Sequence, residues 1–170
     1  MSPDAVPLIV SALLGAQDFA WLDDLRRRHY PVQHNRLPAH LTLFRHLPPS
    51  VAAELRQRLT QATRTGRPAA KAVGPVDLDG GVAIRIASPA LEAIRADLAD
   101  ALFSLLMPQD QAGWQPHVTI QNKVPAAEGR ALAKRLAATF VPRAVRIDGL
   151  AVWSYRGGLW GPVSRHMFRR

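Results

Sequence analysis

The stretches AHLTLF, at residues 39–44, and PHVTIQ, at residues 116–121, decide the fold. Side chains alternate between the two faces of a strand, so each stretch buries aliphatic residues and presents a histidine beside a threonine on its other face. The four polar residues are His40, Thr42, His117 and Thr119. One His-x-Thr strand is weak evidence, because a lone strand histidine is more often structural. Two such strands at equivalent positions of a repeat favour a shared site.

The two motifs lie 77 residues apart, and the pairs Gly80-Gly81 and Gly157-Gly158 have the same spacing. Each half has a motif strand, a helix, a strand, a Gly-Gly turn and a strand, and the offset also brings residues 8–10 onto residues 85–87. Gly-Gly turns are common, so coincidence is the alternative, but the shared element order argues against it. A repeat of this length indicates two lobes rather than a solenoid.

The sequence therefore predicts an α+β protein in which residues 1–170 form a single two-lobed domain. Two antiparallel sheets related by a pseudo-twofold axis would flank a central cleft, with the helices on the outside. Local signals predict a strand at 7–14, a helix capped by Asp18, a helix from Pro49 to about 65, a hairpin around Gly80-Gly81, a helix capped by Ser88, a loop at 108–113, a helix at 125–140 and two closing strands around Gly157-Gly158.

Composition narrows the class of protein. The chain has 170 residues, 48% of them hydrophobic, which is enough for a substantial core. It has no cysteine, which excludes disulfides and thiolate metal sites. The apolar residues 6–16 are too few to span a bilayer. We expect them to form a buried strand of a cytoplasmic protein without a membrane partner.

The charge is distributed unevenly along the chain. The formal net charge is +9, and residues 123–170 contribute +8 of it, with ten Lys and Arg against two Asp and Glu. Such a basic region would attract phosphates or nucleic acid. A solvated surface that aids solubility is the simpler explanation. The charge becomes informative only if it converges on a chemical site.

The paired motifs suit phosphodiester cleavage. This reaction needs one proton removed from the nucleophile and another given to the leaving oxygen, and histidine titrates close enough to neutrality to do either. The threonine hydroxyls can donate hydrogen bonds to phosphate oxygens in the transition state. The sequence contains no HExxH, no carboxylate cluster, no P-loop, no GxGxxG after a strand and no GxSxG elbow. We therefore expect neither a metal nor a cofactor.

The two motifs resemble the paired H-x-T-x motifs of the two-histidine phosphoesterase superfamily, the 2′-5′ RNA ligase-like (LigT-like) proteins. The resemblance covers nearly the whole chain. It implies a bilobal fold and a metal-free hydrolysis of 2′,3′-cyclic phosphates or 2′-5′ phosphodiesters of RNA ends or nucleotides, with 2′-5′ RNA ligation as the reverse reaction. Carried over by motif, His40 protonates the departing ribose oxygen, His117 activates water, and Thr42 and Thr119 hold the phosphate.

Two other functions remain open at this point. The first is a phosphodiesterase that acts on small cyclic nucleotides, and the second is a nucleotide- or RNA-binding module without catalysis. A binding module has little need for two imidazoles placed as acid and base.

Further substrate contacts are predicted around the motifs. Strand alternation would continue the face of His40 to Phe44 and turn Arg45 away from it, and would continue the face of His117 to Lys123. Aromatic residues around the second Gly-Gly turn can stack on bases, although packing across the hairpin is the commoner explanation. The candidate substrate contacts are Phe44, Lys123, Trp153, Tyr155 and Arg156.

Overall fold

The computed structural model describes residues 6–170. Its helices and strands are β1 (Leu8–Leu14), α1 (Ala16–His29), η1 (Val32–His34), β2 (Leu41–Leu47), η2 (Pro49–Val51), α2 (Ala52–Ala62), β3 (Lys71–Asp77), β4 (Val82–Ala87), α3 (Pro89–Ala101), η3 (Phe103–Leu105), α4 (Pro108–Gln111), β5 (His117–Gln121), α5 (Ala126–Thr139), β6 (Arg143–Ala144), β7 (Ile147–Arg156) and β8 (Leu159–Met167), where η marks a 3₁₀ turn.

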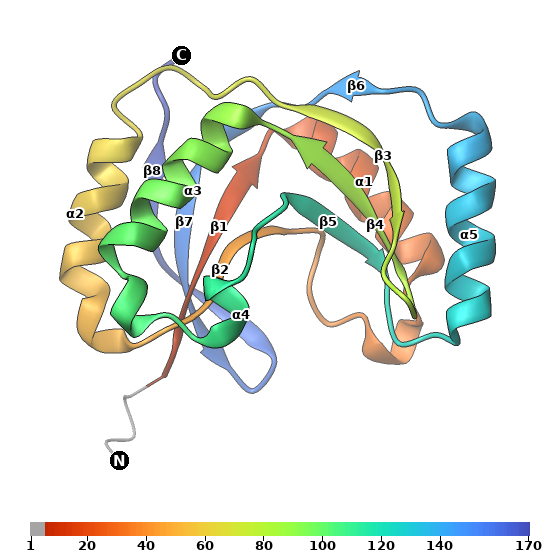
Figure 1. Ribbon diagram of the computed structural model, residues 1–170, viewed down its shortest axis with the longest axis horizontal. Coiled ribbons are helices and arrows are strands. Elements are labelled where there is room, and N and C mark those ends of the chain that lie inside the picture. Colours follow the sequence, from red (N-terminus) through yellow and green to blue (C-terminus); the bar gives the residue numbers. More distant parts are fainter. Residues whose placement is uncertain (1–5) are drawn as a thin grey trace.

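The strands form two four-stranded sheets, in the orders β2-β1-β7-β8 and β5-β4-β3-β6. Every pairing in these sheets is antiparallel. Helices α2 and α3 lie with the first sheet and form the first lobe, whereas α1 and α5 lie with the second sheet and form the second lobe (Figure 1). The expectation of an α+β fold with two antiparallel sheets and outer helices is confirmed.

The two sheets have corresponding strand orders, with each motif strand at one edge, but strand β4 has two counterparts. β4 occupies in the second sheet the place of β1 in the first, next to the motif strand. By sequence offset it also matches β8, because each follows a Gly-Gly turn. The first Gly-Gly turn therefore joins β3 to an inner strand, whereas the second joins β7 to the edge strand β8. The two turns are equivalent in sequence and not in the fold.

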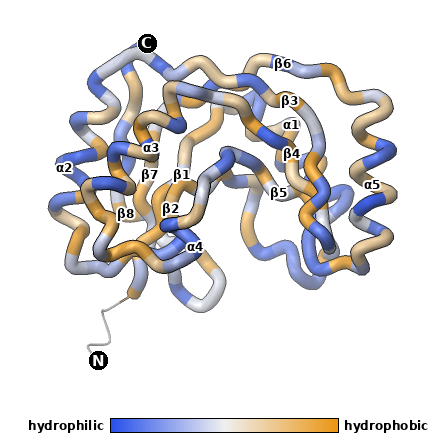
Figure 2. The backbone as a smooth tube through the Cα atoms, in the orientation of Figure 1, coloured by the Kyte–Doolittle hydropathy of each residue, from blue (hydrophilic) through white to orange (hydrophobic). Residues whose placement is uncertain are grey.

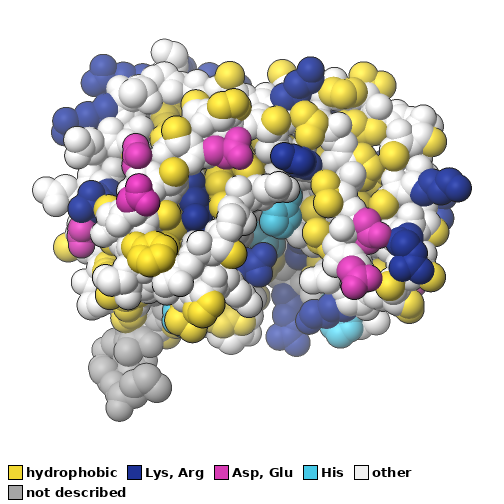
Figure 3. Space-filling model, viewed as in Figure 1, with side chains coloured by type: hydrophobic (Ala, Val, Ile, Leu, Met, Phe, Trp, Pro, Cys, Tyr) yellow, Lys and Arg dark blue, Asp and Glu magenta, His cyan; other side chains and the backbone are white. Residues whose placement is uncertain are grey.

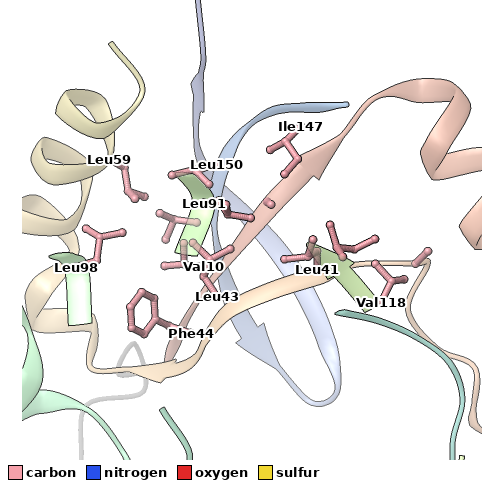
Figure 4. Packing of buried hydrophobic residues seen from close by; sticks show 14 of the residues in the cluster. Val10, Leu41, Leu43, Phe44, Leu59, Leu91, Leu98, Val118, Ile147 and Leu150 are labelled. Carbon is pink, nitrogen blue, oxygen red and sulfur yellow. The ribbon is translucent and has the colours of Figure 1, made fainter. Parts of the chain in front are cut away.

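The core lies between the helices and the sheets. Figure 4 shows Leu59, Leu91 and Leu98 from the helices packed beside strand residues of the first sheet. Leu41 and Val118, the aliphatic neighbours of the two motif histidines, are completely buried and lie close together in the same view. In Figure 2 hydrophobic residues follow β1 and β7, whereas the outer helices α2 and α5 alternate between hydrophobic and hydrophilic residues. The motif strands are thus fixed by their apolar faces.

Two local predictions are wrong. Asp18 does not cap α1, which begins after Gly15; its buried carboxylate instead accepts hydrogen bonds from the Arg143 side chain and the Arg146 N–H. The expected loop at 108–113 contains the helical turn α4, which begins at a proline. The cap at Ser88 is confirmed, because its hydroxyl accepts a hydrogen bond from the Leu91 N–H at 3.3 Å.

Candidate active site

The two motif histidines are held in the same way. The Nδ1 atom of His40 lies 2.8 Å from the Pro38 carbonyl oxygen, and the Nδ1 atom of His117 lies 2.8 Å from the Gln115 carbonyl oxygen. A carbonyl can only accept, so Nδ1 carries the hydrogen in both rings. The Nε2 atom of each ring is therefore left to accept a proton when the ring is neutral and to donate one when it is charged.

Both motifs open onto one cleft of about 840 Å³ between the lobes. Its lining includes all four predicted motif residues, His40, Thr42, His117 and Thr119. Figure 3 shows the hollow between the two lobes, with histidine and basic side chains inside it. The structure thus brings together residues that are far apart in the sequence.

Burial lowers the pKa of His40 to about 4. The Pro38 carbonyl raises this pKa, while the positive charges of Arg26, His117 and Arg45 lower it further. His40 is therefore neutral at physiological pH in the free protein, and its Nε2 atom is a proton acceptor.

The protein is expected to lose stability as the pH falls from about 6.5 to about 4, because the unfolded chain protonates His40 before the folded chain does. The contribution is roughly 3 kcal/mol, complete above pH 6.5 and lost near pH 4. Urea unfolding of the wild type and of His40→Asn at several pH values measures it. The variant should lose less stability over this range, and an identical pH dependence of the two proteins would contradict the argument.

A bulge in β2 changes which residues after the first motif face the cleft. The pairing of β1 with β2 shifts between Val10 and Ser11, so that Leu43 and Phe44 are both buried. Phe44 is completely buried and packs against the Arg95 guanidinium, 4.4 Å from its ring centre. The prediction that Phe44 lines the cleft is wrong, and Arg45, predicted to face away, lines it instead.

The bulge is held by Asp110 of α4. Its two carboxylate oxygens accept hydrogen bonds from the Arg45 N–H at 2.9 and 3.0 Å and from the His46 N–H at 3.1 Å. Asp110 is only 3% exposed, and its charge is stabilised by these backbone donors together with the neighbouring Arg95 guanidinium. The orientation of Arg45 thus depends on a residue of α4, 65 positions further along the chain.

The hairpin of β7 and β8 contributes two aromatic side chains to the cleft, Tyr155 and Trp160. The Trp160 ring lies 4.6 Å from the His40 ring, centre to centre. Trp153 packs against Trp160 and donates a hydrogen bond to the Ser11 hydroxyl at 2.8 Å, outside the cleft lining. Of the aromatic candidates, the structure places only Tyr155 in the cleft.

The remaining basic candidates lie outside the cleft lining. Lys123 is in the turn after β5 with a positive φ of 60°, and Arg156 is at the end of β7. The arginines that do line the cleft are Arg45 and Arg85, and neither belongs to the basic last quarter of the chain. The charge excess at 123–170 therefore does not converge on the motif histidines.

The cleft residues that were not among the predicted contacts include Arg45, Arg85 and Trp160. Trp160 pairs with Tyr155 across the hairpin, and Arg85 pairs with His117 in the sheet. Signals for both existed in the sequence: Trp160 lies beside the second Gly-Gly turn, and Arg85 is the charged residue within an apolar strand. Within residues 6–170, no group of three or more His, Asp or Glu side chains is arranged to hold a metal ion.

A model of the 2′-5′ RNA ligase superfamily matches residues 15–159, most of the chain. The chain belongs to the 2′-5′ RNA ligase superfamily. No curated protein matches this superfamily member in sequence.

Solved structures of similar fold match almost the whole length of this chain. TT0787 of Thermus thermophilus is 15% identical and covers 96% of this chain and 98% of its own, with a TM-score of 0.66. E. coli LigT complexed with NADP+ is 17% identical, with 98% and 99% covered and a TM-score of 0.63. A structure described as a phosphoesterase is 18% identical, with 98% and 100% covered and a TM-score of 0.62. Among residues 6–170, no helix of this superfamily member has the length and apolarity needed to cross a bilayer.

Proposed function

We propose that this protein is a metal-independent phosphoesterase that hydrolyses 2′,3′-cyclic phosphate or 2′-5′ phosphodiester bonds of RNA ends or nucleotides. One observation carries the proposal: two His-x-Thr motifs open onto the same cleft, and each histidine is anchored through Nδ1, while Nε2 has no hydrogen-bond partner among residues 6–170. Membership of the superfamily supports the same reaction class. E. coli LigT, of similar fold, has been crystallised with 3′-AMP, NADP+ and ATP, which favours a nucleotide-like ligand.

In the proposed reaction, the two histidines divide the proton transfers. His117 removes a proton from water, and His40 gives a proton to the departing ribose oxygen; the two roles exchange when the reaction runs toward ligation. His40 is neutral in the free protein, so a bound phosphate must raise its pKa before it can act as the acid. An anion beside the ring has this effect because it stabilises the imidazolium.

The other polar groups of the cleft bind the phosphate. The hydroxyls of Thr42 and Thr119 donate to its non-bridging oxygens, and the guanidinium groups of Arg45 and Arg85 offset its negative charge. The interactions of these groups with the phosphate oxygens become stronger as negative charge develops on the oxygens in the transition state. Both lobes contribute one motif and one arginine.

The test uses the full chain after treatment with EDTA and dialysis. Turnover of a 2′,3′-cyclic nucleotide or of an oligonucleotide with a cyclic end is expected for the wild type and not for the double variant carrying His40→Ala and His117→Ala. Absence of turnover by the wild type, or equal turnover by both proteins, rejects the proposal. Nucleotide binding that survives in the double variant, with no product from either protein, would favour the non-catalytic binding module.

Comparison of substrates separates the RNA enzyme from a small-molecule phosphodiesterase. Tyr155, on the hairpin that borders the cleft, is 43% exposed, so this side of the cleft is open to a longer substrate. A higher kcat/KM for the oligonucleotide than for the mononucleotide supports an RNA-end substrate. The reverse order supports the small-nucleotide alternative.

Tyr155→Ala is expected to raise the KM for a cyclic nucleotide about tenfold, because stacking of one base on an aromatic ring contributes about 1–3 kcal/mol. Steady-state kinetics measure this effect, and kcat should change little because Tyr155 is offered as a base contact and not as a proton-transfer group. Phe103→Ala is the control, since Phe103 is 56% exposed and does not line the cleft. Equal KM values for the two variants would exclude Tyr155 as the base contact.

A further inference from the structure

A buried arginine lies behind the candidate active site. Arg26 of α1 is only 4% exposed, and burial lowers its pKa. Its guanidinium carbon lies 4.1 Å from the centre of the Tyr30 ring. Holding a cation in such a place is costly unless its donors are satisfied. The partners of Arg26 therefore indicate what it stabilises.

Those partners belong to both motif segments. The Nε atom of Arg26 donates hydrogen bonds to the Asn35 side-chain oxygen at 2.9 Å and to the Leu37 carbonyl at 3.0 Å. Its Nη1 atom donates to the Thr119 carbonyl at 2.8 Å. Leu37 directly precedes Pro38, whose carbonyl holds His40, and Thr119 is a residue of the second motif. One planar guanidinium thus connects the two motifs.

The first lobe has a partial counterpart in Arg95 of α3. Its side chain is 6% exposed and donates to the Leu43 carbonyl at 3.2 Å and to the Asp110 carbonyl at 2.6 Å. Arg95 therefore fixes the first motif strand and the loop beside it. Arg26 hydrogen-bonds to segments of both motifs, and its link has a neutral counterpart in Trp114, whose indole N–H donates to the Thr42 carbonyl at 3.0 Å from the segment before the second motif. Of these two links, the one through Arg26 carries a buried charge, so its removal is expected to disturb the placement of the motifs more.

We propose that Arg26 is a positioning residue that sets the placement of His40 relative to His117 by tying the segment before the first motif to the second motif strand. The proposal rests on the proposed function for its kinetic test alone. A reaction that needs two aligned proton-transfer groups is sensitive to small displacements, and a shift of about 1 Å can lower the rate about 10²-fold. Lysine cannot replace the fork of donors, because its ammonium is a single point of charge.

The charge of Arg26 supplies a second, independent readout. The groups that lower the pKa of His40 besides burial are Arg26 on α1, His117 on β5 and Arg45 on β2, while the Pro38 carbonyl raises it. Removing the guanidinium removes one of these cations. The titration midpoint of the His40 ring should then move to higher pH.

The experiment compares Arg26→Gln with Arg28→Gln. Arg28 lies on the same helix, its side chain is 66% exposed and it pairs with Asp24, so this control removes an equal charge without touching the site. Arg26→Gln is expected to lower kcat on a cyclic nucleotide about 10²-fold with little change in KM. NMR titration of the imidazole Cε1 protons should show a higher midpoint for His40, and Arg28→Gln should match the wild type in both measurements.

A milder variant covers the case in which Arg26→Gln does not fold. Asn35→Ala removes one acceptor of Arg26 on a partly exposed loop and leaves the core intact. It is expected to lower kcat severalfold while its thermal unfolding stays close to that of the wild type. Wild-type kcat in folded Arg26→Gln, or wild-type kcat in Asn35→Ala when Arg26→Gln is unfolded, overturns the proposal.

The two proposals fail in different ways. If the wild type turns over no cyclic nucleotide, the proposed function is wrong, and Arg26 is then judged by the titration alone. In that case a higher His40 midpoint in Arg26→Gln supports the positioning role, and an unchanged midpoint overturns it. If Arg26→Gln is unfolded, the readout is the chemical shifts of the His40 and His117 imidazole protons in Asn35→Ala, which keeps the Arg26 charge. Shifts that differ from those of the wild type support the role, and unchanged shifts overturn it.

Discussion

Replacing His40 or His117 by asparagine is expected to lower kcat about 10²–10⁴-fold, with only a small change in KM. The asparagine amide can still donate to the Pro38 or Gln115 carbonyl, which His40 and His117 contact through Nδ1. It cannot transfer a proton at the position of Nε2. The loss is therefore specific to the chemical step. Steady-state hydrolysis of a 2′,3′-cyclic nucleotide measures it.

The double variant distinguishes a cooperating pair from two independent contacts. If His40 and His117 serve one concerted set of proton transfers, the double variant should be only slightly less active than the less active of the two single variants. His29→Asn is the control, because His29 lies at the end of α1 outside the cleft lining. Wild-type kcat in either single motif variant, or losses in the double variant that simply multiply, would contradict the shared mechanism.

The sequence was sufficient to predict which way the motif side chains point, because strand alternation, a local property, determines their orientation. In β5, His117 and Thr119 are partly exposed while Val118 and Ile120 are buried, as strand alternation requires. Leu41 and Thr42 in β2 follow the same rule. The 77-residue offset then indicated that the two polar faces belong to one site, and the structure places them in one cleft.

The residues after the first motif could not be oriented from local pattern. Phe44 turns into the core and Arg45 into the cleft because β2 bulges, and the bulge is fixed by Asp110, which is 65 residues further along the chain. An extra residue in a strand reverses the faces of the residues that follow it, and a second register shift, between Leu8 and Val10 of β1, returns Leu47 to the core. No pattern within 39–47 specifies such a bulge.

The distribution of charge along the sequence did not locate the basic groups of the cleft. Two of its arginines pair with acidic side chains away from the cleft: Arg143 with Asp18, and Arg146 with Asp148. Net charge along a chain does not tell which face of the fold carries it. The cations of the cleft, Arg45 and Arg85, come from the nearly neutral first 122 residues. Only the placement of the strands reveals that these two arginines share a cleft.

Gly81→Ala is expected to destabilise the protein by roughly 3 kcal/mol or more, the upper range for an overpacked core position. A Cβ atom at Gly81 would overlap the Gln121 carbonyl oxygen and lie 2.8 Å from the Asn122 Cα atom. Both contacts are with backbone, so β4 and β5 must move apart. Helix α5 prevents this on the other side, where Gly129 already lies against Gly81. Urea unfolding measures the change.

The control is Gly66→Ala, because a Cβ atom there meets nothing within 4 Å and φ is not positive. It should leave the free energy of unfolding nearly unchanged, and a similar loss in both variants would show that the contact with β5 is not the cause. Gly158, the sequence counterpart of Gly81, provides a sharper contrast. Its φ of +87° disfavours alanine, yet a Cβ atom would meet only the flexible Arg36 side chain. Gly158→Ala should therefore cost about 1 kcal/mol. Glycine is thus required for space at Gly81 and for backbone conformation at Gly158, as expected if the two turns have different neighbours in the two sheets.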